Sequence, residues 1–159
     1  MLEDTLVGFL LPSWKGSKKR KAISTGKFYF FDPGITHMLA GTQTLDRNSH
    51  LYGRSFEQFI AMEIRAYLSY KRKKLPFSYW RSTHGYEVDF LIGEEIAVEV
   101  KASQKITARD FKGLKALEEE KVFKHYLLVS QDPINTREKN FHALYWENFL
   151  NNLWADRFV

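Results

Sequence analysis

The sequence predicts an α/β domain with a mixed β-sheet, and three patterns support this fold class. Apolar residues recur at helical spacing over residues 55–70. Three short strand-like segments then follow one another with brief connections, which is typical of an antiparallel meander. A helix and a further strand come next, and such a crossover favours a parallel strand pair. At 159 residues, the chain is long enough for one domain with a real core.

Residues 1–50 are expected to form an N-terminal extension packed on a core that spans residues 51–159. The first stretch, L-E-D-T-L-V-G-F-L-L-P-S-W, reads as a helix end or a strand that stops at Pro12. A basic loop, G-S-K-K-R-K, precedes K-F-Y-F-F-D-P-G, which predicts a strand ending in a Pro-Gly turn. A short helix is predicted over residues 35–40.

The clearest helix is predicted over residues 55–70, with Ser55 and Gln58 at the spacing of a capping box. Its apolar stripe comprises Phe56, Phe59, Ile60, Ile64, Tyr67 and Leu68. The basic run K-R-K-K follows, where positive charge suits the C-terminal end of the helix dipole.

Strands are predicted at residues 77–81, 86–92 and 96–101, joined by the short connections T-H-G and G-E-E. A second helix begins at Thr107, with Asp110 at capping-box spacing. H-Y-L-L-V-S predicts the strand that returns beside residues 96–101, and residues 146–153 predict a final helix.

Composition limits the classes of function. The formal charge of +5 and the pI of about 9.3 are compatible with nucleic-acid binding without establishing it. The absence of cysteine excludes disulfides and thiolate metal sites and favours the reducing cytoplasm. No apolar run is long enough to cross a bilayer, and M-L-E-D-T-L lacks the pattern of a signal peptide, so no membrane association is expected.

Two predicted strands carry acids among apolar residues. If Gly93, Glu94 and Glu95 form a three-residue loop, Asp89 lies directly opposite Glu99. A two-residue loop would place these acids on opposite faces. Opposed carboxylates repel, and one pKa rises unless a positive group lies between them. A divalent cation with hard oxygen ligands, Mg²⁺ or Mn²⁺, would resolve the repulsion.

Alternatives remain open at this point. Glu99 and Lys101 could form an ordinary solvated pair on an exposed sheet face. In the predicted helix, Glu57 falls at the edge of the apolar stripe and Glu63 nearer its centre. Glu57 could simply be a first-turn acid favoured by the helix dipole, and Glu63 could pair with an arginine. An unrelated α/β domain would be indicated if Asp89 and Glu99 faced opposite sides of the sheet.

Taken together, these residues resemble the PD-(D/E)XK nuclease superfamily, which has the restriction-endonuclease-like fold. In this superfamily a helical Glu precedes a meander that supplies Asp and then Glu-x-Lys. The resemblance is closer to the uncharacterised domain found at the C-terminus of bacterial and archaeal AAA-type ATPases. The motifs L-E-D-T-L, K-F-Y-F-F-D-P-G, G-R-S-F-E, Y-W-R, E-V-D-F and E-V-K occur here in that order.

The resemblance implies a role for each matching residue. Asp89 and Glu99 would hold Mg²⁺ or Mn²⁺ with the Val100 carbonyl, and Glu57 would bind a second ion or position the first through water. Lys101 would orient the attacking water, so the implied catalytic set is Glu57, Asp89, Glu99 and Lys101. Val88 stands where many members have proline.

The function implied is DNA phosphodiester hydrolysis. The phosphate backbone would be held by Arg81, Lys105, Arg109 and Lys112, although basic residues are more often a solvated surface. The alternative is a catalytically silent module of the same fold that binds nucleic acid or a protein partner. An AAA-type ATPase module and a second copy of the chain are the expected protein partners. The chain itself has no G-x-x-x-x-G-K-[ST] phosphate loop, since S-T-G-K lacks the spacing.

Overall fold

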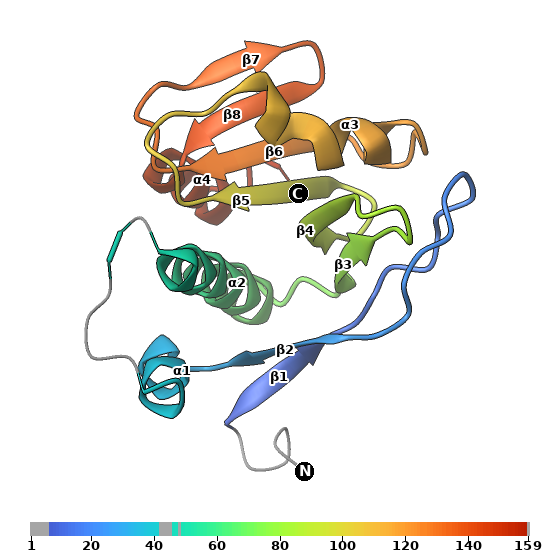
Figure 1. The fold of residues 1–159 in the computed structure, drawn as a ribbon. Coiled ribbons are helices and arrows are strands. Elements are labelled where there is room, and N and C mark those ends of the chain that lie inside the picture. The colour runs from blue at the N-terminus through green and yellow to red at the C-terminus, as the bar shows by residue number, and fades with distance from the viewer. Residues whose placement is uncertain (1–6, 42–45, 48, 159) are drawn as a thin grey trace.

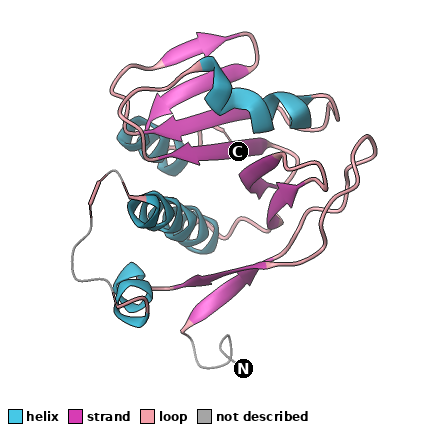
Figure 2. Cartoon of the chain, in the orientation of Figure 1, coloured by secondary structure: helices cyan, strands magenta, loops and turns pink. Residues whose placement is uncertain are grey.

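The computed structural model describes residues 7–41, 46–47 and 49–158. In these residues a mixed sheet of six strands has the order β3-β4-β5-β6-β8-β7 (Figures 1 and 2). Its strands are β3 (Phe77–Arg81), β4 (Glu87–Ile92), β5 (Ile96–Lys101), β6 (His125–Ser130), β7 (Thr136–Glu138) and β8 (Phe141–Tyr145). The strands β3, β4 and β5 form an antiparallel meander, and β5, β6 and β8 run parallel. The predicted α/β class with a mixed sheet is confirmed.

Helices cover both faces of this sheet. The helices are α1 (Pro33–Leu39), α2 (His50–Tyr70), α3 (Lys112–Glu118, preceded by the 3₁₀ turn Ala108–Phe111) and α4 (Trp146–Trp154). One hydrophobic cluster joins α2 and α4 to the sheet through residues such as Ile60, Phe90 and Val129. The other joins α3 to the opposite face through residues such as Leu114, Leu91 and Leu128. The central strands β4, β5 and β6 are therefore buried on both sides.

A two-stranded antiparallel sheet, β1 (Gly8–Leu11) and β2 (Lys27–Phe30), packs against α2 on the side away from the main sheet (Figure 1). Phe9, Leu11 and Tyr29 belong to the same hydrophobic cluster as Ile60 of α2. The helix is thus enclosed between two sheets, and this arrangement brings β2 close to the helix face that carries Glu57.

The segment between β1 and β2 protects the free edge of β3. Trp14 donates its backbone N–H to the Tyr79 carbonyl at 2.7 Å, and Ile23 donates to the Arg81 carbonyl at 2.8 Å. An open strand edge favours pairing with other chains, so this cover reduces the risk of aggregation. It also fixes the start of β2 beside β3 and β4.

Most predicted elements occur where the sequence places them. The meander, the parallel return of β6, the capping box of Thr107 with Asp110 and the last helix are confirmed. Residues 8–11 form a strand, which settles the choice between helix and strand there, whereas the motif L-E-D-T-L lies outside the described residues.

Two predictions about local structure need correction, and two strands lie outside the predicted elements. The helix α2 starts at His50 with Ser49 as its N-cap, and Ser55 lies inside it, donating to the Leu51 carbonyl. Pro33 and Gly34 open α1, with Asp32 as the N-cap, instead of forming a turn. No strand is predicted over residues 136–145, where β8 pairs in parallel with β6 and antiparallel with β7.

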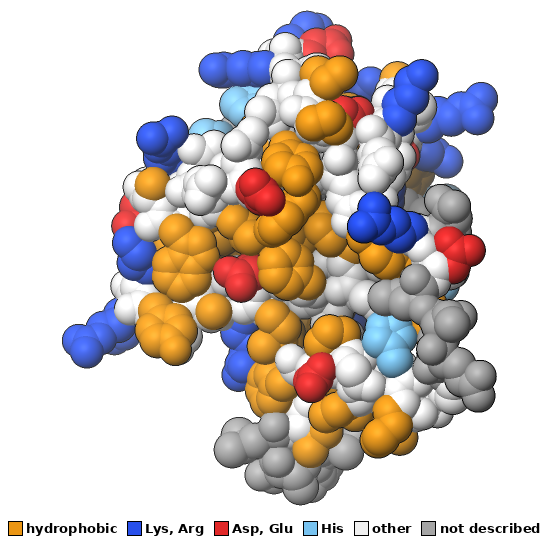
Figure 3. All heavy atoms as spheres, turned by 90° about the vertical axis from the view of Figure 1, so that its left-hand side faces the viewer, with side chains coloured by type: hydrophobic (Ala, Val, Ile, Leu, Met, Phe, Trp, Pro, Cys, Tyr) orange, Lys and Arg blue, Asp and Glu red, His pale blue; other side chains and the backbone are white. Residues whose placement is uncertain are grey.

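The surface carries both apolar and basic regions. Figure 3 shows hydrophobic side chains gathered in the middle of one face, with Lys and Arg side chains toward its rim. Met38 and Leu39 of α1 are among the largely exposed hydrophobic residues. Among the described residues, no helix combines the length and apolar character needed to span a bilayer.

Candidate active site

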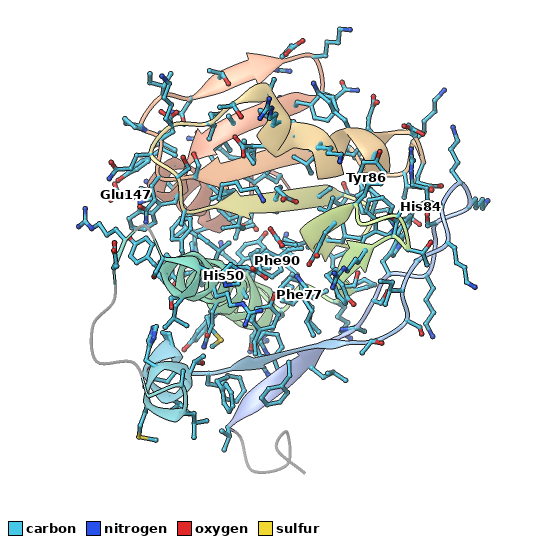
Figure 4. All side chains as sticks on the ribbon, viewed as in Figure 1. His50, Phe77, His84, Tyr86, Phe90 and Glu147 are labelled. Atoms are coloured by element: carbon cyan, nitrogen blue, oxygen red, sulfur yellow. The ribbon has the colours of Figure 1, made fainter. Side chains whose placement is uncertain are left out.

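A pocket of about 770 Å³ lies where β2, α2, β4 and β5 meet. It brings together Glu57, Asp89, Glu99 and Lys101, the four residues singled out from the sequence. We call it the carboxylate pocket, and its lining comprises Lys27, Phe28, Tyr29, Phe30, Thr36, His50, Arg54, Glu57, Gln58, Arg81, Glu87, Asp89, Glu99 and Lys101. His50 comes from the first turn of α2 (Figure 4). Asp89 and Glu99 thus face one pocket, and the arrangement with acids on opposite sides is not found.

The register of β4 and β5 sets up this pairing. Ile92 pairs with Ile96 and Phe90 with Val98, as a three-residue loop at Gly93 requires. Gly93 has a φ of 56°, a left-handed conformation that glycine adopts without strain. Continuing the register by one residue places Asp89 opposite Glu99, although the strand pairing ends at Phe90. The two acids therefore stand at the point where the strands separate.

Alternation along β4 is interrupted just before Asp89. The sequence pattern places Val88 on the face of Phe90, but Val88 packs in the α3-side cluster with Leu91. The cause is a bulge in β4, because Ser78 pairs with Leu91 but Trp80 pairs with Val88, so β4 holds one residue more than β3 over this stretch. Such bulges re-aim side chains, and this one lies directly beside the acid of the strand.

Both acids are buried, with 7% of each residue exposed. Burial raises the pKa of Asp89, and the negative charge of Glu57 raises it further. Burial likewise raises the pKa of Glu99, followed by the charge of Asp89. These shifts mean that the ionised forms are poorly compensated by the protein alone.

Backbone and lysine contacts partly offset this cost. The Val100 N–H donates to Asp89 Oδ2 at 2.8 Å. This contact uses the amide of Val100, whereas the resemblance implied a metal contact from its carbonyl. Lys101 Nζ lies 2.5 Å from Glu99 Oε1. Burial lowers the pKa of Lys101, but the charge of Glu99, the hydrogen bond to Glu99 and the charge of Asp89 together outweigh burial, so the net shift is upward. Lys101 therefore stays charged beside the acid.

Glu57 is held from the opposite wall by β2. The Tyr29 hydroxyl donates to Glu57 Oε1 at 2.5 Å, and Lys27 Nζ lies 3.3 Å from the same oxygen. Burial and the charge of Glu57 raise the pKa of Tyr29, so its hydroxyl remains a donor. Glu57 is thus a pocket residue with defined partners. The alternative of a first-turn acid is wrong, because α2 begins at His50 and Glu57 lies well inside it.

Sequence reasoning missed three residues of this pocket. Lys27 and Tyr29 alternate on one face of β2, and the strand pattern K-F-Y-F could have indicated that they point the same way. Gln58 lies outside the predicted apolar stripe, but it is buried and donates to the Phe30 carbonyl at 2.6 Å. The helical wheel could not reveal that β2 covers this face.

One carboxylate oxygen indicates how a metal would fit. Glu99 Oε2 is buried and has no hydrogen-bond partner among the described residues. In this part of the chain no three acidic or imidazole groups are close enough to form a complete metal cage. Mg²⁺ needs no such cage, because it commonly binds one or two carboxylates and keeps several waters. The pair Asp89 and Glu99 therefore fits Mg²⁺ or Mn²⁺ better than a metal that requires several protein ligands.

The helix α3 closes the pocket from the other side of the sheet. A Cβ on Gly113 would lie 1.9 Å from the Glu87 carbonyl oxygen and 3.3 Å from Glu99 Oε2. Only glycine permits α3 to approach β4 and β5 this closely. The same approach excludes water from Glu99 and contributes to its burial.

The predicted nucleic-acid contacts lie in different places. Arg81 lines the carboxylate pocket, with its Nε 3.5 Å from Glu87 Oε2. Arg109 and Lys112 line a separate cleft of about 500 Å³. Lys105 lies in an exposed turn, and neither pocket includes it. The structure therefore brings Arg81 to the acids and places Arg109 and Lys112 together in a separate cleft.

The second cleft, which we call the basic cleft, is lined by Arg20, Tyr86, Ala108, Arg109, Lys112, Lys115, Ala116 and Glu119. Arg20 and Lys112 approach the Tyr86 ring to 5.2 and 5.1 Å, within reach of a cation–π interaction. Figure 4 shows Tyr86 beside α3, whereas His84 lies further out in the exposed turn. The two pockets share no lining residue, although Tyr86 of the basic cleft and Glu87 of the carboxylate pocket are neighbours in the sequence.

Glu63 has a structural partner outside the pocket. The Trp154 indole N–H of α4 donates to Glu63 Oε2 at 3.3 Å. The partner is thus an indole where the sequence alternative proposed an arginine. This contact joins α2 to α4 and explains an acid near the apolar stripe without any catalytic role.

Comparison with known proteins identifies a family. The family model described as "Domain of unknown function (DUF4143)" matches residues 52–149. Comparison with curated proteins and with solved structures gave no significant match. The matched segment contains Glu57, Asp89, Glu99 and Lys101, whereas Lys27 and Tyr29 precede it. The match covers more than half of the chain, which therefore belongs to the DUF4143 family.

Proposed function

We propose that this chain is a metal-dependent nuclease domain that hydrolyses DNA phosphodiester bonds on a restriction-endonuclease-like core. The observation that carries the proposal is the convergence of Asp89 and Glu99, both buried and both with raised pKa, on one pocket with Glu57 and Lys101. Buried carboxylates that repel one another in a cleft are typical of functional sites. The motif order that resembles PD-(D/E)XK nucleases supports the same assignment.

The residues would divide the chemistry between them. Asp89 and Glu99 would hold Mg²⁺ or Mn²⁺, with Glu57 binding a further ion or acting through water. A bound divalent cation would polarise the scissile phosphate and lower the pKa of the attacking water. Lys101, anchored on Glu99, would orient this water and offset the negative charge that grows on the phosphate.

The basic cleft would offer the phosphate backbone further contacts outside the carboxylate pocket. Arg81 lies in the pocket, and Arg109 and Lys112 line the cleft with Lys115 and Arg20. Cations at such contacts release counterions on binding, so affinity for DNA should fall steeply as salt rises. Lys105, in its exposed turn, would contribute only long-range attraction.

The proposal is tested by a cleavage assay on single-stranded, duplex and branched DNA. The full chain is incubated with Mg²⁺ or Mn²⁺ and compared with Lys101→Ala and with Lys124→Ala. Lys124 pairs with Glu95 on the surface and makes a matched control for loss of one lysine. Metal-dependent cutting that Lys101→Ala abolishes and Lys124→Ala retains is the expected result. If the native chain and the Lys124→Ala control both fail to cut DNA, nuclease activity of this domain is contradicted.

One observation favours a second candidate function, a catalytically silent module that binds nucleic acid or a protein. Lys27 already places a positive charge among Glu57, Glu87 and Asp89. A permanent internal cation could make the acids a purely structural ion-pair cluster. DNA binding without cleavage would then be expected. The protein partner would be an AAA-type ATPase module, tested by co-purification, or a second copy of the chain, tested by light scattering.

A further inference from the structure

Lys27 occupies the centre of the carboxylate pocket. Its Nζ lies 3.3 Å from Glu57 Oε1 and 3.6 Å from Asp89 Oδ1, and it also pairs with Glu87. Its ammonium group lies 5.0 Å from the centre of the Tyr79 ring, which holds it from the side. Three carboxylates thus converge on a single lysine ammonium, while Glu99 turns to Lys101.

The surroundings keep this lysine charged. Its ammonium group pairs with Glu57, Glu87 and Asp89, and three negative charges around one ammonium group favour its charged form. Its side chain is only 24% exposed, so water screens these ion pairs weakly. Lys27 therefore supplies a fixed positive charge at the carboxylate oxygens that the proposed function assigns to metal binding.

We propose that Lys27 is the resident counter-ion of the carboxylate pocket and competes with the divalent cation for Asp89 and Glu57. This inference rests on the proposed function, because it concerns the same carboxylates. A metal ion bound to Asp89 Oδ1 and an ammonium 3.6 Å from that oxygen repel each other across a poorly screened site. Metal entry therefore requires the Lys27 side chain to leave Asp89.

The position of Lys27 in the fold makes this movement feasible. Lys27 is the first residue of β2 and pairs with Leu11 at the end of the β1–β2 sheet where the long connection of residues 12–26 returns, and its side chain has four rotatable bonds. Asp89 and Glu99 lie on the central strands β4 and β5, where both faces of the sheet are covered. The ammonium group can thus move while the acids stay in place. Lys27 thus partly neutralises the apo pocket, and the metal replaces one cation by another.

The inference is tested by titrating Mn²⁺ into the metal-free full chain by isothermal calorimetry, without nucleic acid. The native chain is compared with Lys27→Met, which removes the charge, and with Lys27→Arg, which keeps it. Lys124→Met is the matched control, since it removes a lysine that pairs with Glu95 far from the pocket lining. Thermal unfolding of each variant checks that it is folded, and Lys27→Gln replaces Lys27→Met if the latter does not fold.

An opposite charge at such distances shifts the proton affinity of a carboxylate by about ten- to a thousandfold, and a metal should respond similarly. We therefore expect Lys27→Met to bind Mn²⁺ at least about tenfold more tightly than the native chain. Lys27→Arg and Lys124→Met should stay close to the native affinity. Equal affinity of Lys27→Met and the native chain would overturn this inference and leave the metal-dependent function standing. No Mn²⁺ binding by any variant would overturn both.

Discussion

Two clusters of ionisable side chains in this molecule are built in opposite ways. In the carboxylate pocket, buried acids face other acids, and the pKa of Asp89 and of Glu99 is raised. At the C-terminal end of α2, Asp156 accepts from the Tyr67 hydroxyl at 2.7 Å and pairs with Lys71 at 2.8 Å and Lys73 at 3.2 Å. The hydrogen bond from Lys71, followed by that from Tyr67, lowers the pKa of Asp156.

The Asp156 cluster stabilises the fold because its charges are paired, whereas the carboxylate pocket holds acidic groups whose charges are not fully paired. The Asp156 cluster matches one acid with two cations and a hydroxyl, and it links the end of α2 to the C-terminal segment. The carboxylate pocket leaves Glu99 Oε2 buried without a partner among the described residues. An arrangement that costs stability in the free protein is typical of a binding or catalytic site, where the missing partner is a ligand.

The largest expected effect is the separation of activity from stability in two matched variants. Asp89→Asn should reduce metal-dependent DNA cleavage by about a thousandfold, because a metal ligand contributes several kcal/mol to the transition state. Asp156→Asn should leave cleavage unchanged and lower the thermal midpoint. Initial cleavage rates and thermal unfolding are measured on both. A loss of cleavage in Asp156→Asn equal to that in Asp89→Asn would remove the contrast.

The next effect concerns the packing that buries Glu99. Gly113→Ala places a methyl group against the Glu87 carbonyl, so α3 must move. Overpacking of this kind costs about 1–3 kcal/mol in the free energy of unfolding. Gly53→Ala is the control, since a Cβ there meets nothing within 4 Å and the position lies in α2. It should stabilise by about 0.5–1 kcal/mol. Urea unfolding of both variants measures the difference.

A smaller effect is the opposite pH dependence of the two clusters. The pKa of Asp89 is raised in the folded state, so its charge destabilises the protein above that raised pKa. The pKa of Asp156 is lowered, so its charge stabilises the protein above the ordinary carboxyl pKa of about 4. At neutral pH without metal, Asp89→Asn should therefore unfold at a higher temperature than the native chain, and Asp156→Asn at a lower one.

For each variant, the gap is the difference between its thermal midpoint and that of the native chain. Lowering the pH should close both gaps. The gap for Asp89→Asn should shrink as the pH falls through the raised pKa toward about 4, because native Asp89 then becomes neutral. The gap for Asp156→Asn should persist to about 4 and disappear only below it. Thermal midpoints measured across this range with a chelator present give both curves. Two gaps of the same sign at neutral pH would show that the clusters do not differ as described.

The smallest effect is expected at the exposed lysines around Asp156. Lys71→Met removes one of two cations, and the side chains of the pair are more than one-third exposed. Exposed ion pairs contribute little and are screened by salt. The thermal midpoint should fall slightly at low salt, and the difference should vanish near 1 M NaCl. A difference that persists at high salt would mean that Lys71 acts through packing.

The strands and the acids of the site could be predicted from the sequence because their signals are local. Alternation in I-A-V-E-V-K placed Glu99 and Lys101 on one face, and the G-E-E loop gave the register that opposes Asp89 and Glu99. Helical spacing likewise identified α2 and its apolar stripe. These patterns require only the chain geometry of neighbouring residues.

The other wall of the site could not be predicted because it depends on contacts between distant segments. Lys27 and Tyr29 reach Glu57 only after the β1–β2 sheet packs on α2, and the same packing buries Gln58. The distribution of Arg81, Lys105, Arg109 and Lys112 over pocket, exposed turn and cleft likewise follows from the path of α3 across the sheet. No local periodicity encodes those distances.

The most direct test of the central claim, that Asp89 and Glu99 form a divalent-metal site, is anomalous scattering from crystals soaked in Mn²⁺. The account predicts an anomalous peak within coordination distance of Asp89 and Glu99 in the native chain, and its loss in Asp89→Asn. Lys27 should be displaced from Asp89 in the soaked crystal. Crystals that show no peak at these carboxylates, with Lys27 still paired to Asp89, would contradict the claim and favour a structural ion-pair cluster.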